Sequence, residues 1–327
     1  MAFCLLTAVK NEAPYLIEWV AYHKVIGFDQ IIVCSNDCTD GTDEILSALS
    51  DAGEIVHYST RPGEVDSPQA CAANLARGNG YPRMGEWGIF LDLDEFLNVH
   101  VGERTVHDLA KAVGSKYGIL INWRVFGDSA NKIFPGRHIS NCYSRCARVD
   151  DPINLSIKTF FTRSEEITGF SAAVHRCDVV PHKLALTDFL VGSGSTLSDQ
   201  RPVNKRWLRT GLSTKARSIA GDLGFALAQI NHYAVRDPFS FMLKKRRGRG
   251  FVAVTDQRRT SRHNDDYYAR FNRNEDEDKS ILFWECAVTE EMARLSSRPG
   301  VSVACKMARR RYESAIDEIT LGAFSNE

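Results

Sequence analysis

The sequence lacks a long apolar run, an excess of charge of either sign and any regular spacing of its cysteines. Since no segment approaches the roughly 18 apolar residues that a membrane-spanning helix needs, we expect no transmembrane segment. Lysine and arginine number 41, and so do aspartate and glutamate, which gives a formal net charge of zero over 327 residues. This balance provides no global field to attract nucleic acid or a membrane surface, so neither is an expected partner.

The first residues and the cysteines together indicate a reducing environment. Residues 1–6 are apolar, but Lys10, Asn11 and Glu12 follow almost at once, so the run is too short for a secretion signal and has no basic leader. The nine cysteines are scattered. Without a secretion signal, reduced thiols are the default, and we expect a cytoplasmic location.

Segments with strand and helix patterns alternate over residues 1–100. Short apolar runs predict strands, apolar residues at helical spacing predict helices, and polar turns separate them. Strands are expected at 3–9, 30–34, 55–58 and 89–91, and helices at 15–26, 43–52 and 67–77. Such alternation favours an α/β fold with a parallel sheet and right-handed crossovers, in which these residues form a nucleotide-binding half.

The rest of the chain has weaker periodicity. Residues 185–214 show little pattern and suggest an irregular loop over a site. The tail at 279–321 is helical in pattern, with a break at Pro299-Gly300. Further helices are expected at 105–113 and 239–245, and further strands at 119–125, 158–161, 173–175 and 229–233.

Asp92 and Asp94 follow the apolar strand expected at 89–91. In an extended chain, side chains at i and i+2 point to the same face, so the two carboxylates are expected to lie together. Two hard oxygen ligands suit Mg²⁺ or Mn²⁺, and the carboxyl ends of strands are where α/β sheets bind ligands. A solvated acidic turn is the plainer interpretation, but Glu95 is followed at once by the apolar Phe96 and Leu97, which such a turn does not need.

Four segments of the chain carry motifs that belong together. They are Lys10-Asn11-Glu12 with Tyr15-Leu16, Glu18-Trp19-Val20 and Tyr22-His23; Asn36 with Thr39-Asp40-Gly41-Thr42; Phe90-Leu91-Asp92-Leu93-Asp94-Glu95-Phe96-Leu97; and Asn231-His232-Tyr233 with Phe241, Lys244 or Lys245, and Arg247-Gly248. In this order they resemble the GT-A glycosyltransferases near families 2 and 92. Ser35 and Cys38 stand where members often have Asp and Ser, which leaves recognition of the base open.

The resemblance implies a GT-A fold, with a Rossmann-like, mostly parallel central sheet flanked by helices. It implies a GT-A domain at 1–250, divided into a nucleotide-binding half at 1–100 and an acceptor half at 101–250, and a helical C-terminal extension at 251–327. The implied activity moves a sugar from a nucleotide-diphosphate sugar, most simply a UDP-sugar, to a glycan or other hydroxyl acceptor, as in polysaccharide biosynthesis. Mn²⁺ or Mg²⁺ is the implied cofactor.

The same resemblance implies roles for individual residues. Asp94 is expected to bind the metal directly, Asp92 to bind the ribose or the metal through water, and His232, ahead of His175, to be the third ligand. Glu95 is a catalytic candidate close to the donor. Nucleotide-sugar binding is expected from Lys10, Asn11, Glu12, Asn36, Asp40 and Arg247, although Asp40-Gly41-Thr42 also has the pattern of a turn into a helix.

Several questions stay open at this point. No general base is assigned, since Asp188 and Asp199 have only their place in the irregular loop to support them, and Trp123 suits sugar stacking and core packing equally. Residues 89–94 also resemble the first motif of haloacid-dehalogenase phosphatases, but those chains continue Gly-Thr, whereas Glu95-Phe96 follows here. A non-catalytic nucleotide-sugar-binding module on the same fold is the other alternative, because fold does not fix function.

Overall fold

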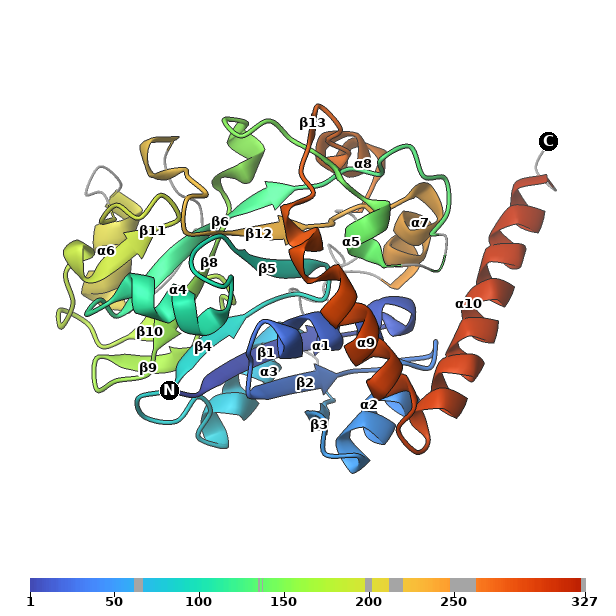
Figure 1. The fold of residues 1–327 in the computed structure, drawn as a ribbon, viewed down its shortest axis with the longest axis horizontal. Coiled ribbons are helices and arrows are strands. Elements are labelled where there is room, and N and C mark those ends of the chain that lie inside the picture. Colours follow the sequence, from blue (N-terminus) through green and yellow to red (C-terminus); the bar gives the residue numbers. More distant parts are fainter. Residues whose placement is uncertain are drawn as a thin grey trace.

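The computed structural model describes residues 1–61, 67–134, 136, 138–197, 202–211, 220–247 and 263–324. Nine strands of these residues form the main sheet: β1 (Phe3–Val9), β2 (Gln30–Ser35), β3 (Val56–Ser59), β4 (Trp87–Phe90), β5 (Glu95–Val99), β6 (Gly118–Val125), β8 (Ile157–Thr162), β11 (Phe189–Val191) and β12 (Ala228–His232). Their order is β3-β2-β1-β4-β8-β6-β12-β5, and β11 pairs with β6. Helices cover both faces of the sheet (Figure 1).

The first four strands form a parallel array. β1 pairs in parallel with β2 and β4, and β2 pairs in parallel with β3. Helices α1 (Leu16–Val25), α2 (Thr42–Asp51) and α3 (Pro68–Gly78) connect them in turn. This arrangement confirms the predicted α/β fold, with the helix-flanked sheet that the resemblance to GT-A proteins implied.

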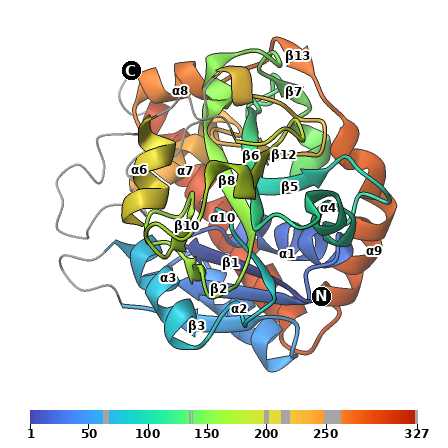
Figure 2. The same ribbon diagram turned by 90° about the vertical axis from the view of Figure 1, so that its left-hand side faces the viewer.

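Alternating side chains of β1 divide the core between the two faces of the sheet, as the two-residue period of a strand requires. Phe3 and Leu5 belong to a buried cluster with α1, α2 and α4 (Val106–Val113), whereas Cys4 and Leu6 belong to one with α3 and α6 (Pro202–Thr210). Figure 2 shows α3 and α6 on one side of the sheet and α1 and α4 on the other.

The second half of the sheet is mixed, and its pairing places residues at the edge where β4 ends. β8 runs antiparallel to both β4 and β6. β12 is parallel to β6 and antiparallel to β5, and its last residue, His232, pairs with Glu95, the first residue of β5. Beyond it, the N–H of Tyr233 donates to the carbonyl of Asp94 at 2.8 Å. His232 is therefore fixed beside the turn that joins β4 to β5.

Three local expectations were wrong. β4 ends at Phe90, so Asp92 and Asp94 lie in a turn, and the two-residue period of a strand does not apply to them. Two hydrogen bonds close the turn. The N–H of Asp92 donates to Glu95 Oε2 at 2.8 Å, and the N–H of Glu95 donates to the carbonyl of Asp92 at 2.9 Å. Residues 173–175 form no strand. The segment at 185–214 was expected to be an irregular loop, but it contains β11 and α6. Their apolar runs are short and lie between polar residues, so the sequence pattern did not reveal them.

The tail is helical, with α8 (Asp265–Phe271), α9 (Glu285–Ser296) and α10 (Val301–Phe324). α9 packs against α1, and α10 packs against α2 and the short 3-10 helix η1 (Ala13–Tyr15). The boundary predicted at residue 250 lies outside the described residues, so the division into domains stays a prediction. No helix among the described residues is long and apolar enough to span a bilayer. The cytoplasmic location also stays a prediction.

Gly41, the N-cap residue of α2, lies close to α10. Its φ is +103°, and a Cβ there would lie 2.7 Å from the Cβ of Ala308 on α10. We expect Gly41→Ala to lower the free energy of unfolding by about 1–2 kcal/mol for the left-handed backbone and by about 1–3 kcal/mol more for the collision. Urea unfolding followed by circular dichroism measures the loss.

Gly53→Ala is the matched control for this substitution. Gly53 also has a positive φ, +72°, but a Cβ there would meet no atom within 4 Å. Its loss of stability should therefore contain the backbone contribution alone. Equal losses at the two positions would show that the approach of α10 to Gly41 contributes nothing to stability.

Candidate functional site: an acidic turn beside a basic pocket

The turn between β4 and β5 holds three carboxylates in four residues. Asp92 Oδ2 lies 3.1 Å from the Nζ of Lys158, and Asp92 Oδ1 accepts a hydrogen bond from Gln69 at 2.5 Å. Lys158 comes from β8, is fully buried, and also lies 3.0 Å from Glu95 Oε2. Burial raises the pKa of Asp92, but the Lys158 ammonium opposes it, and the net shift is downward.

Glu95 lies beneath the turn rather than over a cavity. Its side chain is fully buried, and Oε2 accepts the backbone N–H of Asp92 at 2.8 Å. Burial raises the pKa of Glu95 to about 8, although Lys158 acts in the opposite direction. These contacts give Glu95 a supporting position, because it fixes the backbone from which Asp92 projects.

Asp94 faces a different set of partners. Its Oδ2 contacts the Nζ of Lys244 on α7 (Pro238–Arg247), and the same ammonium donates to the carbonyl of Ala234 at 2.8 Å. Its Oδ1 lies 3.7 Å from Nε2 of His232. Burial lowers the pKa of His232 to about 3 against the pull of Asp94, so its imidazole is neutral at pH 7. Burial raises the pKa of Asp94, but Lys244 together with the other positive groups nearby, Arg236 among them, reverses the effect, and the net shift is downward.

The side chains at this turn include two that suit a divalent ion. Among the described residues, no three His, Cys, Asp or Glu side chains gather closely enough to hold a metal by themselves. Asp94 and His232 nevertheless provide an ionised carboxylate and a neutral imidazole, with Nε2 of the imidazole 3.7 Å from Oδ1 of Asp94. Two protein ligands fit a Mg²⁺ or Mn²⁺ that takes its other ligands from phosphates and water. The donor set therefore fits the predicted ion as a two-ligand site.

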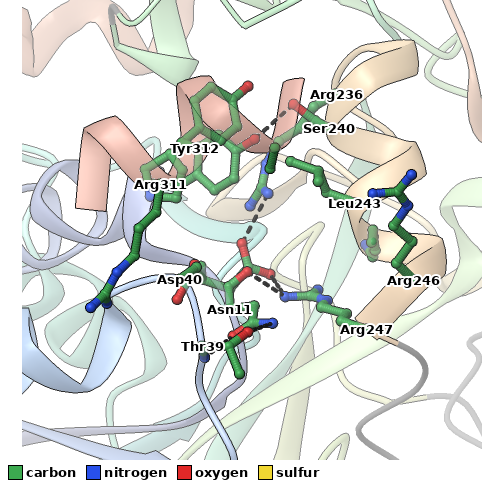
Figure 3. Close-up of a pocket in the computed structure, with 15 residues that line it drawn as sticks. Asn11, Thr39, Asp40, Arg236, Ser240, Leu243, Arg246, Arg247, Arg311 and Tyr312 are labelled. Carbon is green, nitrogen blue, oxygen red and sulfur yellow. Dashed lines mark hydrogen bonds and ion pairs between the residues drawn. The ribbon is translucent and has the colours of Figure 1, made fainter. Parts of the chain in front are cut away.

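Lys244, which contacts Asp94, also lines a pocket of about 360 Å³. Figure 3 shows this pocket. Its walls come from the loops after β1 and β2, from η1 and from helices α7 and α10. Five basic side chains line it against two carboxylates, and the polar set is Asn11, Glu12, Thr39, Asp40, Arg236, Ser240, Lys244, Arg246, Arg247, Arg311 and Tyr312. A cluster of guanidinium groups with this excess of positive charge suits a phosphate-bearing ligand.

Glu12 and two arginines form the floor of the pocket. The buried Glu12 carboxylate lies 2.9 Å from Nη1 of Arg236 and also contacts Nη1 of Arg247. Arg247 donates in addition to the carbonyl of Lys10 at 2.6 Å, so it fastens the loop after β1 to α7. Burial raises the pKa of Glu12, but the two guanidinium groups reverse the shift.

Arg236 was missed by the sequence analysis, although it lies inside the fourth motif. It is only 5% exposed, its Nε and Nη2 make no hydrogen bond within the described chain, and its Cζ lies 3.6 Å from the centre of the Tyr15 ring. Its φ of +55° is uncommon for a residue of this size. Arg236 lines the pocket, so its guanidinium adds positive charge there, while its two unpaired nitrogens are themselves buried.

The predicted nucleotide-binding residues are brought together only in part. Asn11, Glu12, Asp40 and Arg247 line the pocket. Asp40 closes the turn that leads into α2, since its carboxylate accepts hydrogen bonds from the backbone and hydroxyl of Thr42 and from the N–H of Ala13, while Gly41 is the N-cap residue. Lys10 and Asn36 do not line the pocket and both lie against Asp37, at 3.6 and 3.4 Å.

The motif residues of α1 act on the turn from below. Trp19 donates to the carbonyl of Glu95 at 2.8 Å, and Tyr22 donates to that of Leu97 at 2.9 Å. His23 Nε2 accepts the N–H of Leu97 at 3.4 Å. All three rings are buried and hold the backbone of β5, so their spacing in the sequence reflects support of the turn.

Other candidates fall outside the pocket or outside the described chain. Trp123 is 6% exposed, and its ring lies 4.0 Å from that of His232, which is a packing role. Asp188 accepts the N–H of Ala185 at 2.7 Å and closes a short turn. Asp199, Gly248 and Arg249 are not among the described residues. Arg311 and Tyr312 were missed because α10 carries no motif.

Comparison with known proteins supplies a family match. A model described as Glycosyltransferase family 92 matches residues 1–165, which include β1, β4 and the acidic turn. A glycosyltransferase family 92 protein of Ricinus communis is 27% identical over 145 residues, covering 43% of this chain and 26% of that protein. One of Oryza sativa subsp. japonica is 27% identical over 146 residues, covering 44% and 24%.

This chain therefore spans only about a quarter of the length of these two curated relatives. A crystal structure of S. aureus TarS aligns with 97% of this chain and 55% of that one, at 12% identity and a TM-score of 0.35. A likeness this distant adds nothing about ligands.

His23 should make the stability of the protein depend on pH. Burial lowers its pKa to about 3, whereas a histidine in an unfolded chain titrates near 6.5. Between these values the unfolded chain holds a proton that the folded chain does not, so the free energy of unfolding falls as the pH drops from about 6.5 toward 3. Denaturant unfolding at several pH values should show His23→Gln with a slope weaker by up to about 1.4 kcal/mol per pH unit. An unchanged slope in the variant would contradict the assignment.

Proposed function

The chain belongs to glycosyltransferase family 92, and from this premise we propose that it transfers a sugar from a nucleotide-diphosphate sugar to a hydroxyl acceptor. One observation carries the proposal. The Asp94 carboxylate, beside the neutral imidazole of His232, is joined through Lys244 to a pocket lined by five basic side chains. A site for a divalent ion next to a site for an anion is the arrangement that departure of a diphosphate requires.

The chemistry places its demand on the leaving group. Negative charge grows on the diphosphate as the bond to the sugar breaks, and fixed cations at that position stabilise the transition state. Arg236, which lines the pocket and holds its charge against the buried Glu12, is our first candidate for this contact. Arg247, committed to the loop after β1, holds the wall of the pocket in place. A divalent ion, when bound, would supply further Lewis-acid stabilisation to the phosphates.

We assign Asp94 and His232 as the residues that would hold Mn²⁺ or Mg²⁺. Asp92 is proposed to reach the donor or a metal-bound water, with Lys158 and Gln69 setting its direction. Glu95 is proposed as a positioning residue, because its carboxylate binds the backbone of the turn. Asn11 at the pocket, with Lys10 and Asn36 behind it, is proposed to contact the nucleotide, and UDP is the first nucleotide to test.

A glycan or other hydroxyl compound, as in polysaccharide biosynthesis, is the proposed acceptor. No side chain near the turn is assigned as a general base, since Glu95 is fully buried beneath it. A non-catalytic module that only binds nucleotide sugar would share the pocket and the acidic turn. Release of nucleoside diphosphate from a panel of nucleotide sugars, with water or simple glycans as acceptors, separates an enzyme from such a module.

Asp94→Asn should lower the release of nucleoside diphosphate by about 100-fold or more, because the site loses the charge that would hold the ion. Excess chelator should abolish turnover of the wild-type protein, and Mn²⁺ should restore it. Asp178→Asn is the control, since Asp178 pairs with Arg77 and does not line the pocket. Full activity of the wild-type protein in chelator would refute metal dependence.

The pocket should prefer ligands with more phosphate charge. Calorimetric titration in the presence of Mn²⁺ should give UDP at least tenfold tighter binding than UMP, and uridine the weakest binding, because each added phosphate meets cations of the pocket. The same series with guanosine and adenosine nucleotides identifies the base. Absence of binding by every nucleoside diphosphate at millimolar concentration would argue against a nucleotide-sugar donor.

A further inference from the structure

Lys244 links the acidic turn to the basic pocket. Its ammonium contacts Asp94 Oδ2 and the carbonyl of Ala234, while its side chain lines the pocket. The side chain is 12% exposed, so this contact is shielded from bulk water. The same carboxylate has His232 3.7 Å from its other oxygen. Asp94 is thus the group on which a lysine and the proposed metal site converge.

Two cations cannot both occupy this carboxylate at contact distance without strong repulsion. Like charges a few ångströms apart repel by several kcal/mol at the effective dielectric of a protein. Arg236 and Arg247 form ion pairs with Glu12 nearby, and their positive charges repel the Lys244 ammonium. A divalent ion approaching Asp94 and His232 must therefore displace Lys244.

The pocket offers the displaced ammonium a destination. A lysine carries its charge on a flexible four-carbon chain. Rotation of the side-chain bonds can therefore move the ammonium while the backbone of α7 stays in place. An empty pocket with an excess of positive charge is a poor destination, whereas a pocket that holds a diphosphate is a good one. Release of Asp94 by Lys244 is therefore favourable only when an anionic ligand is present.

We propose that Lys244 is an exchangeable counter-ion of Asp94, which blocks the metal site until a nucleotide diphosphate draws its ammonium into the pocket. This inference rests on the proposed function. Its consequence is that metal and diphosphate bind together more tightly than either binds alone, and by linkage each strengthens the other by the same factor. Lys244 is a positioning residue in this scheme, and the empty protein is protected from binding metal without donor.

The test measures binding of Mn²⁺ by calorimetry, with no turnover needed. Without nucleotide, Lys244→Met should bind Mn²⁺ at least tenfold more tightly than the wild-type protein, because Asp94 has lost its competing cation. With UDP present, the increase in Mn²⁺ affinity should be smaller in the variant than in the wild type. Since UDP itself binds Mn²⁺, the comparison between proteins in the absence of nucleotide is decisive.

Two further variants guard the interpretation. Lys245→Met removes the neighbouring charge on α7, which lies 3.8 Å from Asp265 and does not line the pocket, and it should leave Mn²⁺ binding unchanged. Lys244→Gln removes the charge but keeps a hydrogen-bond donor, so it should reproduce the effect of Lys244→Met if the latter folds poorly. Thermal unfolding of each variant confirms that it is folded.

The outcomes separate this inference from the proposed function. If the wild-type protein binds Mn²⁺ together with UDP, but both Lys244 variants bind nucleotide-free Mn²⁺ with wild-type affinity, the counter-ion role is wrong while the metal site stands. If no variant and not even the wild-type protein with UDP binds Mn²⁺, the metal-dependent function and the counter-ion role fall together. The proposal is supported if nucleotide-free Mn²⁺ binds more tightly to the two Lys244 variants and not to Lys245→Met.

Discussion

Charge compensation at the turn between β4 and β5 is the constraint on which the rest of the site depends. Asp92, Asp94 and Glu95 bring three carboxyl groups into a largely buried turn, where desolvation opposes folding and the charges of Asp92 and Asp94 repel each other. Two lysines from elements distant in the sequence neutralise this negative charge. Lys158 serves Asp92 and Glu95 from one side, and Lys244 serves Asp94 from the other. Removal of either lysine would leave a carboxylate without its cation in a place that water reaches poorly.

The mixed half of the sheet explains how these partners arrive. β8 lies antiparallel between β4 and β6, which carries Lys158 to the turn, and β12 pairs with β5, which carries His232 there. The parallel half provides a rigid frame and the carboxyl ends of strands, where an α/β sheet offers a crevice. α1 then holds β5 from below through Trp19 and Tyr22. The acidic turn therefore receives its partners from α1, α3, α7, β8 and β12.

The sequence allowed the parallel half to be predicted because its signals are local. Apolar runs and turn residues define β1 to β4 and the helices between them, and the contact of Asp40 with the first residue of α2 follows from the residues next to it. The partners of Asp92 and Asp94 could not be predicted in the same way. Lys158 is one lysine among many in the sequence, and only the register of β8 places it beneath the turn. The position of the Arg236 side chain likewise depends on a left-handed backbone conformation, which no sequence motif predicts.

The pocket has two walls with different origins. Asn11, Glu12 and Asp40 come from the segment that matches the family model, whereas Arg236, Lys244, Arg247, Arg311 and Tyr312 lie beyond it. Lys244 is the residue of this second wall that also contacts the acidic turn. Changes along α10, or on α7 away from Lys244, alter the shape and charge of the pocket without removing that contact. A chain that keeps residues 1–165 together with His232 and Lys244 can therefore keep the acidic turn and its partners while the rest of the facing wall, and with it the ligand, diverges.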